Sequence, residues 1–435
     1  MSAPPKTRLA ISCGDPNGIG IEVALRAFAD PRLYRYVTPV LFASLEMAEL
    51  HREACGLDEV ALREATLDRI DPDVQAVQVV RCWEHEPPVE FGRVSPEGGA
   101  VAKTSLEHAA EALRAGQADA LVTAPIHKSA MQQAGFGYPG HTEYLEHAFG
   151  DGRSLMLMVG DDGLRVALAT NHVPLKNVAN AISPTILQNK IALLEEALRR
   201  DFGIVGPSIA VLALNPHAGD GGAIGTEEEV TIRPAVEAMK RKGVDVMGPY
   251  PADGFFGSGN YRNFDGILAM YHDQGLVPFK TLAFGGGVNF TAGLSVVRTS
   301  PDHGTALDIA GQGRAGAASF TEAVFAARQI HLARAGYDEA HANPIKIRKW
   351  DRKRGGGGGK RNQRRGDDVR PHRKEVAGTR ANEDAQVVAP ERASAAAAKT
   401  AQPAGAPRSD NPTTGRPADA GSAPGGHPEG TPPEA

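Results

Sequence analysis

Long apolar runs and paired cysteines are both missing from this 435-residue chain. No apolar stretch approaches the roughly 18–20 residues that a membrane-spanning helix needs. The apolar stretch behind the N-terminal prolines is also too short for a secretory signal. Cys13, Cys55 and Cys82 are odd in number and lack the spacing of metal ligands. We therefore expect a reduced, cytoplasmic protein without disulfides or membrane contact.

Positive charge is scarce in the larger part of the chain. Residues 1–342 carry 29 Lys+Arg against 41 Asp+Glu, whereas residues 343–435 carry 18 against 11. An acidic body argues against nucleic acid as its main ligand. Residues 343–435 are basic and glycine-rich, then rich in Ala, Pro and Gly, so they cannot bury enough apolar surface to fold. We predict a catalytic body over 1–342 and a disordered, dispensable tail whose basic part could contact RNA, although a solvated extension without a role is the simpler interpretation.

Strand and helix patterns alternate along the body. Helical periodicity covers 98–116, 183–203 and a segment after Thr226, where Thr226 and Glu229 have the spacing of a capping box. This alternation predicts an α/β fold with a largely parallel sheet, whose ligands gather at the carboxyl ends of the strands. The apolar segments expected to form strands are 7–13, 36–43, 74–80, 120–124, 155–160, 164–170, 208–214 and 266–271.

Three histidines follow such strands. His172, His217 and His272 stand just after apolar segments and beside Pro, Asp or Gly residues. Imidazole is a good ligand for zinc and similar divalent ions, and catalytic metal sites often use three protein ligands. A single histidine in such a place is more often a hydrogen-bonded structural group. The shared context of the three keeps a metal site open as the alternative.

Polar and basic residues form a second group. Lys280, Asn289 and Arg298 lie within an otherwise uncharged stretch, where Lys or Arg could bind an anionic substrate, although they could also be ordinary residues of a hairpin. His141 and Thr142 precede another helical segment, with Thr142 placed to cap it, and helix N-termini attract anions. The motif GQGRAG at 311–316 follows a helical pattern and not a strand, so it is not a Rossmann fingerprint.

Nine segments follow one another in order along the body: GDPNGIG, TAPIHK, GHTEYLE, ALATNHVPL, LNPHAGDGG, GTEEE, AMYHDQGLVPFK, GVNFTAGL and RTSPDHGTALDIAG. Each is weak alone, but together they resemble the 4-hydroxythreonine-4-phosphate dehydrogenase family of vitamin B6 biosynthesis. The resemblance spans residues 7–336 and is highly specific. Residues after about 342 have no counterpart in the family pattern.

The resemblance implies a two-lobed α/β fold similar to isocitrate and isopropylmalate dehydrogenases, with the active site in the cleft between the lobes. GDPNGIGIEV and HGTALDIAGQG are similar to a turn and a cofactor loop of those enzymes. A non-Rossmann site for NAD or NADP is therefore expected around one loop. Its residues would be His303, Gly304, Thr305, Ala306 and Asp308.

The resemblance also implies the roles of the remaining residues. His172, His217 and His272 would hold one divalent ion (zinc, magnesium or cobalt), and Asp253 is a weaker candidate for proton acceptor or partner of the site. The substrate would be the small phosphorylated hydroxy amino acid 4-phosphooxy-L-threonine, oxidised and then decarboxylated to 3-amino-2-oxopropyl phosphate. The family implies a homodimer with an active site shared between subunits. The substrate contacts would be His141, Thr142, Lys280, Asn289 and Arg298.

Three other functions remain open. A related dehydrogenase of 4-phospho-threonate or of a cyclic dihydrodiol carboxylate would share the metal histidines. A metal-dependent hydrolase would also use three histidines, to activate water. The third alternative is not an enzyme. It is a protein that binds a phosphometabolite, or that binds RNA through the basic tail.

Overall fold

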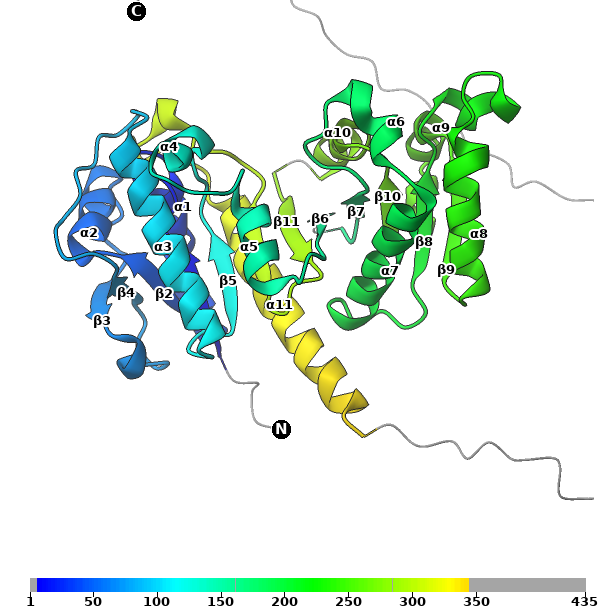
Figure 1. Ribbon diagram of the computed structural model, residues 1–435. Helices are drawn as coiled ribbons and strands as arrows, with labels where there is room; N and C mark the ends of the chain where they lie inside the picture. Colours follow the sequence, from blue (N-terminus) through cyan, green and yellow to red (C-terminus); the bar gives the residue numbers. More distant parts are fainter. Residues whose placement is uncertain (1–5, 161, 284, 344–435) are drawn as a thin grey trace, which may run out of the picture. The chain divides into compact units, whose positions relative to one another are not determined.

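A computed structural model describes residues 6–160, 162–283 and 285–343, so the predicted tail lies, from residue 344 on, outside the described residues. The described residues belong to one compact unit built on a twelve-stranded sheet (Figure 1). The strands are β1 (Thr7–Ser12), β2 (Val37–Ala43), β3 (Leu62–Ala65), β4 (Val77–Arg81), β5 (Ala120–Thr123), β6 (Leu155–Val159), β7 (Arg165–Leu168), β8 (Ser208–Leu212), β9 (Asp245–Tyr250), β10 (Gly266–Ala269), β11 (Val288–Ala292) and β12 (Arg298–Pro301).

The sheet is largely parallel, as the alternating pattern predicts. Its order is β3-β4-β2-β1-β5-β12-β11-β6-β7-β10-β8-β9. Eight of the eleven neighbouring pairs run parallel, and only the pairs around β6 and β11 are antiparallel. All eight strands predicted from the sequence are present, together with four that were not predicted.

Helices cover both faces of this sheet, so its strands are buried on both sides. Leu9 and Ile11 of β1 pack in the cluster that includes residues of α1, α2 and α11, whereas Ala10 packs with α3 on the other face. The same alternation occurs in β10, where Leu268 joins the first cluster and Ile267 joins a third. The helices are α1 (Gly20–Ala27), α2 (Leu45–Ala54), α3 (Pro96–Arg114), α4 (Lys128–Gln133), α5 (His141–Phe149), α6 (Val178–Ala181), α7 (Pro184–Arg200), α8 (Arg233–Arg241), α9 (Ala252–Gly257), α10 (His272–Leu282) and α11 (Ala318–His341).

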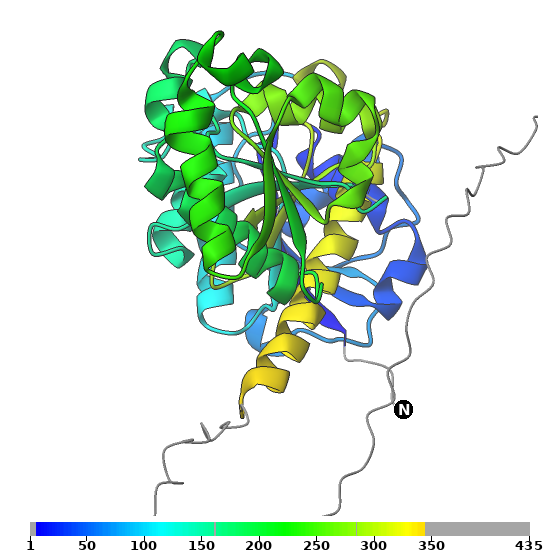
Figure 2. The ribbon, with the colours of Figure 1, turned by 90° about the vertical axis from the view of Figure 1, so that its right-hand side faces the viewer.

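The longest of these helices, α11, packs against the middle strands of the sheet and against two other helices. It contacts β5, β11 and β12 as well as α1 and α7. Figure 2 shows it in yellow behind the green segment that contains α7 and α8. Within the described ranges, none of the helices combines the length and the apolar character needed to cross a membrane.

Two helices begin where the sequence pattern Ser-Pro favours a start. At two other helices the structure differs from the predicted start. Ser95 and Ser183 each cap a helix whose first residue is proline, as the pattern Ser-Pro favours. The predicted capping box at Thr226 is wrong, because the Glu229 carboxylate pairs with Arg233 and the helix opens with a π-turn. Thr142 does not cap α5 either, since the helix already begins at His141.

Candidate active site

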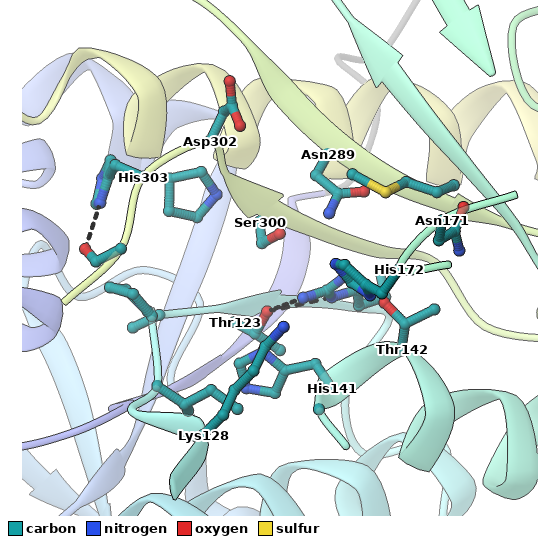
Figure 3. A pocket seen from close by; sticks show the side chains of 18 of the residues that line it. Thr123, Lys128, His141, Thr142, Asn171, His172, Asn289, Ser300, Asp302 and His303 are labelled. Carbon is teal, nitrogen blue, oxygen red and sulfur yellow. Dashed lines mark hydrogen bonds between the residues drawn. The ribbon is translucent and has the colours of Figure 1, made fainter. Parts of the chain in front are cut away.

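All five predicted substrate residues line one cavity of about 310 Å³ (Figure 3). A volume of that size holds a small metabolite. The cavity also includes His172 and two residues of the predicted cofactor loop. The predicted residues that line it are His141, Thr142, His172, Lys280, Asn289, Arg298, His303 and Gly304.

The sheet brings these residues together although they are far apart in the sequence. β12 runs parallel to β5, so the loops after these two strands open at the same edge. β11 runs antiparallel to β12, and Asn289 near its start therefore lies opposite Ser300 near the end of β12. Helix α5 brings His141 and Thr142 to the same place.

Arg298 is the buried cation of the cavity. Only 2% of its surface is exposed. Its guanidinium donates to the Thr123 hydroxyl from Nε (3.1 Å) and Nη2 (2.6 Å), and to the Thr291 hydroxyl from Nη1 (3.1 Å). Burial lowers the pKa of Arg298 to about 10. A buried cation held by hydroxyl groups, with none of the described carboxylates in hydrogen-bond contact, is prepared to bind an anion.

His141 lies beside this cation and is held neutral. Burial lowers its pKa well below the usual range, and the positive charges of Arg298 and Lys128 lower the pKa further. Lys128, the first residue of α4, lines the cavity too, and Figure 3 shows its side chain next to His141. The cavity therefore offers positive charge from more than one side together with a neutral imidazole.

Several buried polar atoms around the cavity have no hydrogen-bond partner among the residues that the structure describes. Buried polar groups are normally paired, so orphaned atoms around one cavity indicate a polar ligand. Figure 3 shows these side chains on different walls of the cavity. The atoms are His141 Nε2, Asn171 Oδ1, Asn289 Oδ1 and His303 Nε2.

Lys280 closes one side of the cavity from α10 and is paired with an acid. Its Nζ lies 3.1 Å from Asp302 Oδ1. Burial raises the pKa of Asp302, although the Lys280 ammonium acts in the opposite direction. Asp302 directly precedes His303, so this ion pair joins the substrate residues to the predicted cofactor loop.

Two of the three predicted metal ligands lie side by side. The ring centroids of His172 and His272 are 5.9 Å apart. Burial lowers the pKa of His172, which favours the neutral imidazole that binds metals. His272 Nδ1 is 2.7 Å from Asp273 Oδ1, and such a carboxylate contact leaves Nε2 available to an ion. Two imidazole groups this close offer the nitrogen donors that zinc and similar ions prefer, so this pair fits a divalent metal.

His217 lies in a neighbouring cavity of about 850 Å³ that also contains Asp253. This second cavity is lined mainly by apolar groups of α9 and α10, including Val277 and Leu282. Among the described residues, no three His, Cys, Asp or Glu side chains gather closely enough to hold a metal ion. Within one chain, the predicted three-histidine set is therefore present only as the pair of His172 and His272.

The predicted cofactor loop follows β12 and packs against the N-terminal motif GDPNGIG. The Ile19 N–H donates to the Thr305 carbonyl oxygen (3.0 Å). A side chain at Gly18 would meet that oxygen at 2.7 Å, so this close approach requires glycine. Ala306 has a positive φ of 40° and leads into a short turn that contains the exposed Asp308. Only His303 and Gly304 of this loop reach the first cavity.

Several residues of the first cavity were not predicted from the sequence. Three of them lie in segments that carried the resemblance: Lys128 in TAPIHK, Asn171 in ATNH and Asp302 in SPDHG. Asn171 follows an apolar segment directly before His172, so the signal that singled out that histidine could also have found it. Lys128 begins α4 five residues after β5, and Asp302 follows β12, which was not predicted, so neither carried that signal. Thr123, Glu143 and Ser300 also line the cavity and were not predicted.

Comparison with known proteins agrees with the fold. A protein from Bacteroides thetaiotaomicron, 4-hydroxythreonine-4-phosphate dehydrogenase, is 47% identical over 80% of this chain and 95% of its own length. The crystal structure of 4-hydroxythreonine-4-phosphate dehydrogenase from Klebsiella pneumoniae matches at 33% identity and a TM-score of 0.66, over 76% of this chain and 99% of that one. A terephthalate 1,2-cis-dihydrodiol dehydrogenase from Burkholderia xenovorans matches at 28% identity and a TM-score of 0.51, over 76% and 98%. Since the model of the family "Pyridoxal phosphate biosynthetic protein PdxA" also matches residues 35–327, the chain belongs to that family.

Proposed function

We propose that this protein is a 4-hydroxythreonine-4-phosphate dehydrogenase. It would oxidise the C3 hydroxyl of 4-phosphooxy-L-threonine with NAD or NADP. The resulting oxo acid would lose CO₂ to give 3-amino-2-oxopropyl phosphate, within pyridoxal phosphate biosynthesis. Family membership and the names of the relatives support this proposal.

The cavity around Arg298 carries the proposal. Arg298, Lys280 and Lys128 line it with positive charge, as a substrate with phosphate and carboxylate groups requires. His141 and Asn289 add unpaired polar atoms that can fix the orientation of the substrate. We assign His141, Thr142, Lys280, Asn289 and Arg298 as the substrate contacts.

We assign His172 and His272, completed by His217, as the ligands of one divalent ion. When bound, such an ion acts as a Lewis acid, which lowers the pKa of a coordinated hydroxyl and stabilises the charge formed during decarboxylation. The residues of the chain orient the substrate beside that position, and burial lowers the pKa of His172. Asp253, which lines the same cavity as His217, is the weaker candidate for a proton acceptor.

The loop from His303 to Asp308 is proposed to bind the nicotinamide dinucleotide. It begins at the wall of the substrate cavity, because His303 and Gly304 line that cavity. Such a position would place the reactive ring next to the substrate and the remainder of the dinucleotide along the loop. Hydride transfer needs this adjacency of the two reacting carbons.

A homodimer with shared active sites completes the proposal. The described chain gathers only two of the three proposed metal ligands. His217 lies instead at an apolar cavity whose residues Val277 and Leu282 are 63% and 41% exposed. A symmetric dimer could cover this surface and supply a ligand across the interface.

Formation of reduced nicotinamide from 4-phosphooxy-L-threonine, with and without added Co²⁺, tests the proposed function. We expect absorbance of the reduced cofactor only with metal present, and loss of the signal on chelation. Faster turnover of 4-phospho-threonate or of a dihydrodiol carboxylate would assign the protein to a related dehydrogenase. Metal-dependent phosphate release without cofactor reduction would indicate a hydrolase.

A further inference from the structure

The loop that carries His217 has an unusual backbone. Residues 217–221, within the turn Pro216–Gly222, all have positive φ values between 44° and 79°. His217, Ala218 and Asp220 carry side chains, and L residues other than glycine adopt this region rarely, seldom in succession. A run of this kind persists only where surrounding contacts hold it in place.

Glu228 makes several of those contacts, and Glu227 adds one by accepting from Asn215 Nδ2 at 2.8 Å. Glu228 is fully buried in the π-turn Glu228–Ile232. Its Oε1 accepts the backbone N–H groups of Leu214 and Asn215, both at 2.8 Å, and its Oε2 accepts from Asn215 Nδ2 at 3.0 Å. The carboxylate therefore anchors the chain two residues before His217. Hydrogen bonds to an ionised acceptor are stronger than those to a neutral one.

The Glu228 carboxylate also lies against the backbone of the loop after His217, at Gly219. A Cβ atom at Gly219 would lie 2.7 Å from Glu228 Oε2, so the loop backbone packs directly on the acid. His217 is thus held between an anchored residue and a packed residue. Glu229, the next residue along the chain, points elsewhere and pairs with Arg233 at 3.0 Å.

We propose that Glu228 is a positioning residue, which holds the left-handed loop and thereby sets the place of the His217 imidazole. This inference rests on the proposed role of His217 as a metal ligand. The π-helical turn that begins at Glu228 contributes to this positioning, because it brings the carboxylate into contact with the loop. Single π-helical turns within helices frequently occur at functional sites. The segments LNPHAGDGG and GTEEE then act as one unit.

Glu228→Gln in the full-length protein tests the proposal, with Glu229→Gln as the matched control. Glutamine keeps the size of the side chain but replaces one acceptor oxygen by a donor that faces Asn215 Nδ2. In the metal-free protein we expect amide hydrogen exchange in residues 214–225 to become at least about tenfold faster. Titration with Co²⁺ alone should show binding weakened by about ten- to a hundredfold. Glu229→Gln should match the wild type in both measurements.

Each possible result supports or refutes the proposed role of Glu228. Wild-type exchange in Glu228→Gln would overturn the anchoring, and faster exchange with unchanged Co²⁺ affinity would overturn the positioning role. Titration of His217→Ala separates the two proposals: if that variant also binds Co²⁺ normally, the metal role of His217 fails while the exchange data still report on Glu228. If Glu228→Gln does not fold, Gly219→Ala, which places a methyl group against the same carboxylate, is measured in its place and must show both effects.

Discussion

Replacing Arg298 by methionine should separate substrate binding from folding. The guanidinium is buried, and burial lowers its pKa to about 10, against about 12.5 for an ordinary arginine. That difference corresponds to about 3 kcal/mol of unfavourable free energy for the charge in the folded protein near neutral pH. Methionine fills a similar volume without the charge, so this cost disappears in the variant.

The substitution also removes favourable contacts. The hydroxyl groups of Thr123 and Thr291 lose the guanidinium as a partner, at roughly 1–2 kcal/mol each. The two effects nearly cancel, and we expect the free energy of unfolding to change by less than about 2 kcal/mol. An anionic substrate, in contrast, loses a charge-assisted contact worth about 1.5–3 kcal/mol, or about ten- to a hundredfold in affinity.

Two measurements on the same variant test this reasoning. Denaturant unfolding gives the stability, and titration calorimetry gives the affinities for 4-phosphooxy-L-threonine and for NAD(P). Arg63→Met is a suitable control, because Arg63 is exposed and pairs with Asp71 at the surface. Equal losses of substrate and cofactor affinity, or a stability loss above about 4 kcal/mol, would refute the assignment of Arg298 as a substrate ligand and make it a structural residue.

Three further predictions concern the histidines. His217→Ala should lower Co²⁺ occupancy at least about tenfold, abolish turnover and leave NAD(P) binding intact; normal turnover with a chelator present would contradict the metal role. His172→Ala and His217→Ala, each inactive alone, should regain roughly a quarter of wild-type activity when their subunits are mixed, if each site takes ligands from both subunits of a symmetric dimer; no recovery despite subunit exchange would place all ligands in one chain. Burial lowers the pKa of His51 to about 4, so the unfolded chain binds a proton that the folded chain does not. The free energy of unfolding should therefore fall by about 3 kcal/mol between pH of about 6.5 and 4, and His51→Gln should flatten that profile; an unchanged profile would be the contrary result.

The sequence by itself determined the architecture and the chemical character of the site. Apolar segments alternate with helical ones, and the strands bury both faces, so their near-continuous apolar runs could be recognised without tertiary information. His172, placed just after such a run, could be selected because ligands gather where parallel strands end. Arg298 could be selected as a cation in an otherwise uncharged stretch, and His141 because it precedes a helical segment. The nine segments, found in the same order, also identified the family of the chain.

The tertiary structure alone decided which of these residues meet. Asn289 reaches the cavity because β11 runs antiparallel to β12, a direction that its own sequence does not encode. Lys128 and Asp302 stand in recognisable segments, but their nearness to His141 and Lys280 depends on how loops from different strands converge. The place of His217 depends on backbone torsions and on a buried acid eleven residues later. Such long-range contacts arise from packing and the directions of strands, and residue types in sequence order do not specify them.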